Sequence, residues 1–339
     1  MSTESPPDAA FTFLSKGAII QEFRVGNHNI VLGFPEAKFY KTHNAPYFGE
    51  TIGRTTNRVK DAQLHDLNGK TYHLYANDGP NSLHGGKEGW GKKDFEGPRP
   101  VNRNGMKGVQ FTYTSRDGEE GYPGTVECNV WYTASKEDEV TVLDVEYQVD
   151  FVGDECEETV TGVTNHSYFN LNPTSPTIAD HVVTLSTTNH LALDSNSIPT
   201  GKILPHPDAP SPNASFTLGA TRPSFDDCFI LDPHPTNIPL DTRTLPLRHL
   251  VTLSHPVTKL HLEILSTEPA FQFYTGEHID VPELAGNDGS KIPRMGSRKG
   301  IAVEPSRYVD AQRKEWRSMC RLGKGEVWGA KSRYRAWKG

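Results

Sequence analysis

The sequence lacks the short motifs that mark several common kinds of enzyme. It contains no G-x-x-x-x-G-K-[ST] segment and no strand-coupled G-x-G-x-x-G, so nucleotide phosphate binding has no support. Its 14 histidines include no H-E-x-x-H pair and no cluster with cysteine at zinc-ligand spacing. A G-x-S-x-G nucleophile elbow is also missing. What remains is a set of polar segments that strand packing does not require.

Cysteine, positive charge and long hydrophobic runs are also scarce. The four cysteines lie far apart without a C-x-x-C pair, which indicates reduced thiols. The net charge of −7 is unfavourable for binding nucleic acid, because phosphates require a positive surface. No apolar run approaches the roughly 20 residues of a membrane helix, and the first residues do not resemble a signal peptide. We therefore expect a cytoplasmic protein without a membrane or nucleic-acid partner.

What the sequence has in abundance is alternation of polar and apolar residues over short runs. Such runs, rich in Val, Thr, Phe and Tyr, occur at residues 18–25, 108–113, 125–132, 140–147, 259–265 and 270–274. This period of two indicates half-buried β-strands, and the 30 glycines and 25 prolines separate the runs at turn-like intervals. Many short strands favour an all-β sandwich or barrel. The only segment that suggests a helix is Asp310 to Leu322, and residues 205–223 and 232–246 are expected to be long loops.

Five polar segments stand out because strand packing does not require them. They are Gly53–Arg58, Asn77–Gly86, Thr164–Leu171, Phe225–Phe229 and Gly300–Ser306. The last contains an apolar run that ends in Glu304, where partial burial would raise the pKa of the carboxyl and suit it to a general base. Taken singly, each segment is equally consistent with surface or structural residues.

Taken together and in order, these segments resemble the galactose mutarotase, or aldose 1-epimerase, family. The matching stretches are Gly53-Arg54-x-x-Asn57-Arg58, Asn81-Ser82-Leu83-His84-Gly85-Gly86, Thr164-Asn165-His166-Ser167-Tyr168-Phe169-Asn170-Leu171, Phe225-Asp226-x-Cys228-Phe229, Gln272-x-Tyr274-Thr275-Gly276 and Glu304-x-x-x-x-x-Asp310-Ala311. The resemblance extends from about residue 15 to the end. It implies a large antiparallel β-sandwich with few short helices, formed by residues 15–339 as a single domain after a flexible N-terminus at residues 1–14.

The resemblance also implies roles for individual residues and the absence of a cofactor. Glu304 matches the base that takes the proton from the C1 hydroxyl of a sugar, and His166 matches the acid that protonates the ring oxygen. His84, Arg54 and Asp226 match positions that bind the sugar. The remaining members of the expected substrate-binding set, which support the cleft, are Asn81, Gln272 and Tyr274. The expected partner is a small aldose, galactose or glucose first, and the protein is expected to be a monomer or homodimer.

Other functions remain open at this stage. Family members often carry Glu-x-Gln, whereas this chain has Glu304-Pro305-Ser306, which leaves the preferred sugar undecided. The lysines at positions 87, 92 and 93 follow the His84 loop and could hold the phosphate of a hexose 6-phosphate. A non-catalytic sugar-binding protein on the same fold is a further alternative. A glycosidase that pairs Glu304 with Asp226 is another.

Overall fold

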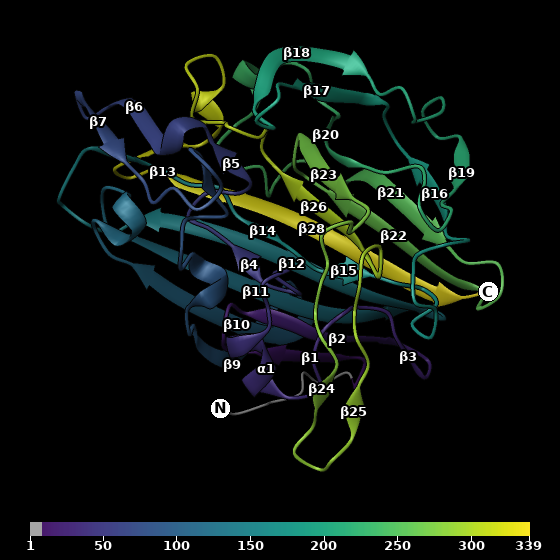
Figure 1. Cartoon of the computed structure of the whole chain (residues 1–339). Helices are drawn as coiled ribbons and strands as arrows, with labels where there is room; N and C mark the ends of the chain where they lie inside the picture. Colours follow the sequence, from purple (N-terminus) through teal and green to yellow (C-terminus); the bar gives the residue numbers. More distant parts are fainter. Residues whose placement is uncertain (1–8) are drawn as a thin grey trace.

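Residues 9–339 are described by a computed structural model, which contains two large antiparallel sheets. The nine-stranded sheet has the order β19 (Ser215–Thr217), β16 (Val182–Leu185), β21 (Arg248–Ser254), β22 (Leu260–Ser266), β28 (Val327–Lys338), β12 (Val140–Phe151), β11 (Val126–Glu137), β10 (Met106–Ser115) and β9 (Glu96–Arg103). The six-stranded sheet has the order β15 (Tyr168–Phe169), β26 (Ile301–Ser306), β23 (Ala270–Tyr274), β20 (Asp226–Ile230), β17 (Asn189–Leu193) and β18 (Pro199–Pro205). The long C-terminal strand β28 runs through the middle of the larger sheet, between β12 and β22 (Figure 1).

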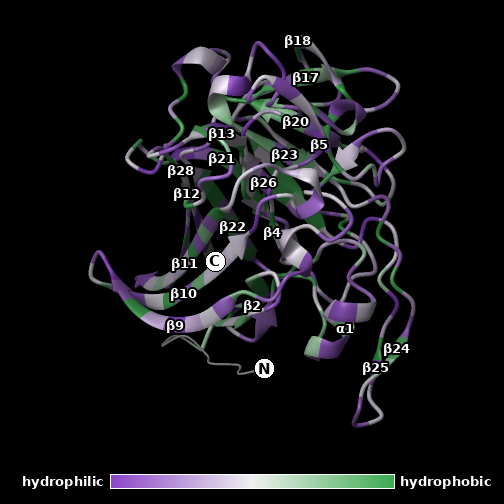
Figure 2. Ribbon diagram, turned by 90° about the vertical axis from the view of Figure 1, so that its left-hand side faces the viewer, coloured by the Kyte–Doolittle hydropathy of each residue, from purple (hydrophilic) through white to green (hydrophobic). Residues whose placement is uncertain are grey.

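Smaller elements surround these two sheets. A three-stranded sheet contains β1 (Phe11–Leu14), β2 (Ile19–Val25) and β3 (His28–Asn29). Two-stranded pairings join β13 (Glu158–Val160) to β27 (Arg321–Gly323), β14 (Thr164–Asn165) to β4 (Thr51–Ile52), β5 (Arg58–Val59) to β8 (Ser82–Leu83), β6 (Gln63–Leu67) to β7 (Lys70–His73), and β24 (Leu284–Ala285) to β25 (Lys291–Ile292). The β24–β25 hairpin projects from the body of the molecule (Figure 2).

The described residues contain few and short helices. They are α1 (Ala37–Thr42) and the 3₁₀ turns η1 (Lys60–Ala62), η2 (Trp90–Lys92), η3 (Glu119–Gly121), η4 (Pro235–Asn237) and η5 (Arg317–Met319). Within residues 9–339, no helix is both long and apolar enough to cross a membrane. The prediction of an all-β antiparallel architecture is confirmed.

The main hydrophobic core lies between the two large sheets. Alternate residues of the six-stranded sheet, such as Phe271, Phe273 and Val303, are fully buried in it. They share this core with Leu143 and Ile264 of the nine-stranded sheet. Burial of large apolar side chains contributes about 1.5–3 kcal/mol each, so this layer is a major source of stability. The period-2 runs of the sequence therefore mark the inner faces of the sheets.

Three local expectations need correction. The segment from Asp310 to Leu322 contains the short turn η5 and the start of strand β27 in place of an α-helix. Asp310 adopts a left-handed φ of 57°, and the segment buries Trp316 and Met319. Strand β1 lies inside the tail expected to be flexible, because Phe11 and Phe13 are each only 1% exposed and pair with β2. Residues 1–8 of that tail lie outside the described residues. The expected loop at 205–223 contains the edge strand β19.

Candidate active site

Strands β23 and β26 place polar side chains on the face of the six-stranded sheet that points away from the main core. Gln272 pairs directly with Glu304, and the neighbouring pair, Phe273 and Val303, faces the opposite way. Because successive strand residues alternate between faces, the same register that buries the two apolar residues directs the amide and the carboxyl outward. Glu304 is thus delivered by a strand whose other face is anchored in the core.

The segment between β14 and β15 brings His166 to this face. β15 pairs with β26, and Tyr168 lies opposite Ala302. His166 precedes Tyr168 by two residues, and the centroids of the two rings lie 5.0 Å apart. Backbone hydrogen bonds hold the segment in place, since the His166 amide donates to the Glu50 carbonyl at 2.8 Å and its own carbonyl accepts from the Gly49 amide at 3.1 Å.

The second imidazole, that of His84, directly follows strand β8 of the β5–β8 pair. The His84 amide donates to the Asn57 carbonyl at 3.0 Å, and the Asn57 amide donates to His84 Nδ1 at 3.3 Å. The loop passes close to other backbone at Gly85, which has a φ of 84° and where a Cβ would lie 1.9 Å from the Gly53 carbonyl oxygen. Only glycine fits both restrictions. Since His84 Nδ1 is an acceptor, the neutral ring carries its proton on Nε2 and can donate it into the pocket.

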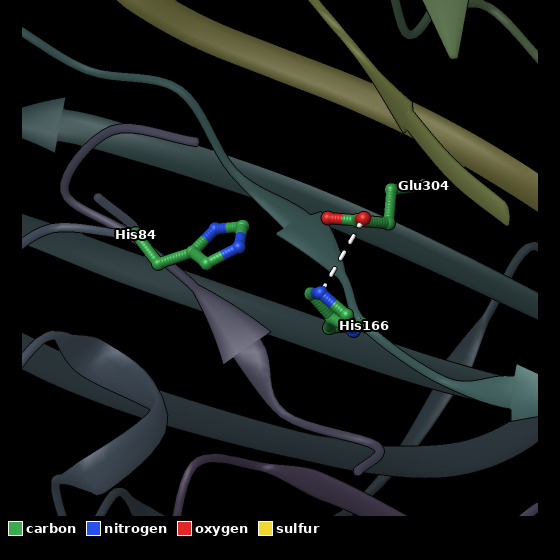
Figure 3. A group of neighbouring side chains, drawn as sticks. All are labelled: His84, His166 and Glu304. Carbon is green, nitrogen blue, oxygen red and sulfur yellow. Dashed lines mark ion pairs between the residues drawn. The ribbon is translucent and has the colours of Figure 1, made fainter. Parts of the chain in front are cut away.

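These side chains line a pocket of about 230 Å³. Its walls are Ala45, Pro46, Tyr47, Asn57, Arg58, Leu83, His84, His166, Tyr168, Asp226, Gln272, Tyr274, His278, Asp280 and Glu304. Figure 3 shows His84, His166 and Glu304 converging from three separate segments. A wider cavity of about 450 Å³ lies between η1, the 194–200 turn and residues 310–317, but it contains none of these three residues. We therefore take the smaller pocket as the candidate active site.

His166 and Glu304 form the closest titratable pair in the pocket. His166 Nε2 lies 3.4 Å from Glu304 Oε1, and the side chains are only 5% and 4% exposed. Burial lowers the pKa of His166 to about 3. Burial, aided by the negative charge of Asp226, raises the pKa of Glu304 well above its ordinary value. Removal from water thus favours the uncharged form of both groups, which leaves one exchangeable proton on the pair near neutral pH.

The rest of the pocket can supply hydrogen bonds to a polar ligand. Asp226 Oδ1 accepts from Gln272 Nε2 at 2.7 Å, which fixes the carboxylate and the amide relative to each other. The Tyr274 hydroxyl accepts from the His278 amide at 2.6 Å. Burial, together with the charge of His166 in its protonated form, lowers the pKa of His84 well below its usual value, so this ring is a neutral donor.

Two members of the expected substrate-binding set lie outside the pocket. Arg54 is 1% exposed, and its guanidinium donates to the carbonyls of Pro123, Gly124 and Ser115 at 2.8–2.9 Å. Asn81 is 3% exposed, and its side chain accepts from the Asp61 amide at 3.0 Å. The backbone occupies these polar groups, so the structure does not bring Arg54, expected to bind the sugar, or Asn81, expected to support the cleft, into the pocket.

Arg58 and Tyr47 are among the pocket-lining residues to which the sequence reasoning gave no role. Arg58 belongs to the same segment as Arg54, and its Nε donates to Asp78 Oδ2 at 2.7 Å while the side chain stays 18% exposed. Tyr47 has a left-handed φ of 65°, and its ring centroid lies 4.9 Å from that of His84. The Gly-Arg-x-x-Asn-Arg spacing was a signal for Arg58, because it offered two arginines, but nothing in the sequence marked Tyr47.

Comparison with known proteins places this chain in a family. The family model described as aldose 1-epimerase matches residues 3–335. The chain belongs to the aldose 1-epimerase family. It is similar to the human galactose mutarotase, with 35% identity over 84% of this chain and 76% of that protein. It is also 34% identical to the bifunctional protein gal10 of Schizosaccharomyces pombe, over 96% of this chain.

The chain spans 44% of the length of that bifunctional relative. Solved structures of other aldose 1-epimerase relatives have the same fold. A GalM/aldose epimerase homologue from C. elegans matches with a TM-score of 0.79 and 23% identity, over 97% of this chain and 95% of that one. A galactose 1-epimerase from Lactobacillus acidophilus matches with a TM-score of 0.76 and 21% identity, over 98% and 93% of the two chains. The predicted family and fold are both confirmed.

Proposed function

We propose that the protein interconverts the α and β anomers of a free aldohexose, with galactose and glucose as the first candidates. The observation that carries the proposal is the buried pair of His166 Nε2 and Glu304 Oε1, 3.4 Å apart, in a small polar pocket. Opening a cyclic hemiacetal requires that one proton is removed and another is delivered. A neighbouring acid and base can do both without a covalent intermediate.

In the proposed reaction, the Glu304 carboxylate removes the proton from the C1 hydroxyl. The C1–O1 bond becomes a carbonyl, the bond from C1 to the ring oxygen breaks, and that oxygen takes a proton from the His166 imidazolium. Rotation about C1–C2 exposes the other face of the aldehyde, and the same steps in reverse close the ring. Opening therefore moves one proton from His166 to Glu304 through the sugar, and closure returns it.

The low polarity around the pair affects the two states of this cycle differently. The pair is charged before ring opening and neutral after it. Because burial disfavours the charged forms of both His166 and Glu304, it favours the enzyme state that accompanies the open-chain aldehyde. This bias lowers the barrier for ring opening when contacts in the sugar complex stabilise the charged His166–Glu304 pair enough to populate it. We assign these contacts to His84 Nε2–H, Arg58 and Asp226, which line the pocket.

The pocket favours a neutral sugar over a phosphorylated one. Among the described residues, its lining includes one arginine and no lysine, together with the carboxyl groups of Asp226, Asp280 and Glu304. Lys87 and Lys93 do not line it, and Lys93 lies within 3.7 Å of Glu88 and 3.5 Å of Glu119. Phosphate binding favours clustered arginine or lysine, so the hexose 6-phosphate alternative lacks its main requirement.

Polarimetry of fresh α-D-glucose and α-D-galactose tests the proposal directly. We expect the purified protein to accelerate the decay of optical rotation, and expect glucose 6-phosphate to be a much poorer substrate. Calorimetric sugar binding without acceleration would instead support a non-catalytic sugar-binding protein. Hydrolysis of an aryl glycoside would support a glycosidase that uses Glu304 and Asp226.

A further inference from the structure

Lys92 lies directly behind the candidate active site, on η2. Its ammonium group donates to Glu50 Oε1 at 2.6 Å and to the Asn44 carbonyl at 2.7 Å, and it lies 4.5 Å from the centre of the Tyr47 ring. The Glu50 side chain is fully buried. The lysine therefore contacts the pocket wall from the protein side and does not line the pocket itself.

The loop that Lys92 contacts also carries the backbone contacts of His166. The loop comprises residues 44–50. Its Gly49 amide donates to the His166 carbonyl at 3.1 Å, and its Glu50 carbonyl accepts from the His166 amide at 2.8 Å. The Asn165 side chain adds a bond from Nδ2 to the Gly49 carbonyl at 2.9 Å. Any shift of the 44–50 loop is therefore transmitted to the imidazole through main-chain atoms.

Tyr47 is held in this loop in an uncommon backbone conformation. A φ of 65° is rare for a bulky residue, and it persists only where the surroundings impose it. Here Asn44 supplies part of that restraint, because its side chain accepts from the Phe48 amide at 2.9 Å and donates to Glu50 Oε1 at 2.7 Å. Glu50 thus receives hydrogen bonds from Asn44 and Lys92 together.

The Tyr47 ring in turn contacts both active-site imidazoles. Its centroid lies 4.9 Å from that of His84 and 5.7 Å from that of His166, and the two imidazoles are 5.1 Å apart. A cation over an aromatic ring attracts it, and the attraction strengthens when both are partly removed from water. Lys92, Tyr47 and the two histidines therefore form one contiguous layer of contacting side chains.

We propose that Lys92 is a positioning residue for the aldose 1-epimerase reaction, which with Glu50 and Asn44 fixes the 44–50 loop and thereby the orientation of Tyr47 and His166. The proposal rests on the function proposed above. Lys92 acts through these neighbours, because it does not line the pocket. Small displacements of a catalytic group can reduce rates by as much as about 10²-fold, so the loss of this support has a measurable kinetic consequence.

The charge of Lys92 gives the proposal a second readout. Burial is the main cause of the low pKa of His166, and the positive charge of Lys92 lowers this pKa further. The same charge also lowers the pKa of His84. The other groups that face His166 are Glu304 at 3.4 Å, with His84, Tyr47 and Tyr168 as ring neighbours. Because a nearby cation disfavours the imidazolium, removal of the Lys92 charge must raise the pKa of His166.

The test compares Lys92→Met, which keeps an apolar chain but removes the charge, with Lys92→Arg, which keeps the charge. Lys93→Met is the matched control, because the Lys93 side chain is 24% exposed against 25% for Lys92 and, within residues 9–339, forms ion pairs with Glu88 and Glu119. We expect Lys92→Met to lower kcat about tenfold with a smaller change in KM. Lys92→Arg should recover most of the rate, and Lys93→Met should match the wild type.

A double-mutant cycle separates positioning from general damage. If Lys92 acts through Tyr47, the effects of Lys92→Met and Tyr47→Leu on kcat must be strongly non-additive. Lys92→Met leaves the buried Glu50 carboxylate without its cation and could prevent folding. In that case the double variant Glu50→Gln/Lys92→Met, which removes both charges, takes the place of the single variant in the test. Additive effects, a wild-type kcat for Lys92→Met or the double replacement, or the same loss in Lys93→Met would overturn the proposal.

The titration of the His166 ring, followed by NMR in the full chain, needs no turnover. We expect its midpoint to move to higher pH in Lys92→Met and to stay unchanged in Lys93→Met. Absence of mutarotation by the wild-type protein would remove the proposed function, and the titration would then still test the contact between Lys92 and the imidazole layer. An unchanged midpoint in Lys92→Met would contradict that contact whatever the activity.

Discussion

His166 Nε2 lies 3.4 Å from Glu304 Oε1, and each of the two side chains is about 95% buried by its surroundings, with 5% and 4% of its surface exposed. Glu304 lies on β26, and His166 lies in the segment that leads into the neighbouring strand β15. This arrangement places a proton donor and a proton acceptor within reach of one small ligand. Its low exposure also sets the protonation states on which several predictions depend.

Glu304→Gln and His166→Gln are each expected to lower kcat/KM for mutarotation by about 10²–10⁴-fold. A positioned general acid or base contributes a factor of this order, and the amide cannot exchange the proton. Because the two groups act as a unit, the double variant is expected to lose little more than either single one. Polarimetry gives the rates. Glu283→Gln, at an exposed carboxylate that pairs with Lys291, is the control and should keep wild-type activity.

The pH dependence of kcat/KM follows from the opposite shifts of the pair. The active form of the pair carries one proton. This form disappears when a second proton binds and when the last proton dissociates. Because burial lowers the pKa of His166 to about 3, the second proton binds only in acid. Because burial raises the pKa of Glu304 well above 4.5, the last proton is retained toward neutral pH. The two limbs belong to the coupled pair.

We therefore expect the acid limb of the kcat/KM profile well below pH 6.5. Substantial activity should remain at pH 5. A profile that loses half its activity near pH 6.5, as an exposed histidine would give, contradicts this account. The comparison is made at constant ionic strength, with the folded state monitored by circular dichroism at each pH.

Glu304→Gln is expected to stabilise the protein at neutral pH while it inactivates it. Above pH 4.5, the unfolded state loses the Glu304 proton, whereas the folded state keeps it until its raised pKa is reached. The folded state thus binds more protons over this window, so this group's contribution to stability falls as pH rises. Glutamine has no such penalty. We expect a gain on the order of 1 kcal/mol near pH 8.

Thermal unfolding at pH 4 and pH 8 checks this prediction. The difference in Tm between Glu304→Gln and the wild type should be small at pH 4, where both states carry the proton, and should grow at pH 8. An equal difference at the two pH values would mean that packing, and not ionisation, accounts for the effect.

The elements that sequence reasoning predicted well are those governed by local alternation. The run at residues 270–274 appears as β23, and the apolar approach to Glu304 appears as β26, because a period of two fixes which side chains face the core. The expected helix at Asp310 to Leu322 failed because tertiary burial of Trp316 and Met319 replaces helical periodicity there. Sequence patterns do not report such long-range packing.

The residues predicted for the candidate site also fall into two groups. Glu304, His166, His84, Asp226, Gln272 and Tyr274 come together in the pocket, whereas Arg54 and Asn81 do not. A loop carries no regular period, so the spacing of Arg54 and Arg58 could not tell which guanidinium points to the ligand. The structure separates them, because Arg54 has backbone carbonyls to bind and Arg58 lies beside the pocket. That separation gives the final prediction.

Arg54→Met and Arg58→Met are expected to impair different properties, the stability of the fold in the first variant and sugar binding in the second. Arg54→Met removes the guanidinium donor of the Gly124 and Ser115 carbonyls in a buried site, while the Pro123 carbonyl keeps its bond from Thr159 Oγ1 at 2.6 Å. Each unsatisfied group costs about 1–3 kcal/mol. We expect it to lower the free energy of unfolding by about 3 kcal/mol or more. Arg58→Met removes only a partly exposed ion pair with Asp78, worth roughly 0–1 kcal/mol.

Arg58→Met should instead weaken sugar binding. A hydrogen bond to a charged group contributes about 1.5–3 kcal/mol, so KM should rise by roughly tenfold or more while the free energy of unfolding changes little. Urea unfolding and polarimetric kinetics on both variants separate the two roles. If Arg54→Met folds normally with a raised KM, and Arg58→Met has wild-type kinetics, the roles that we assign to the two arginines are reversed.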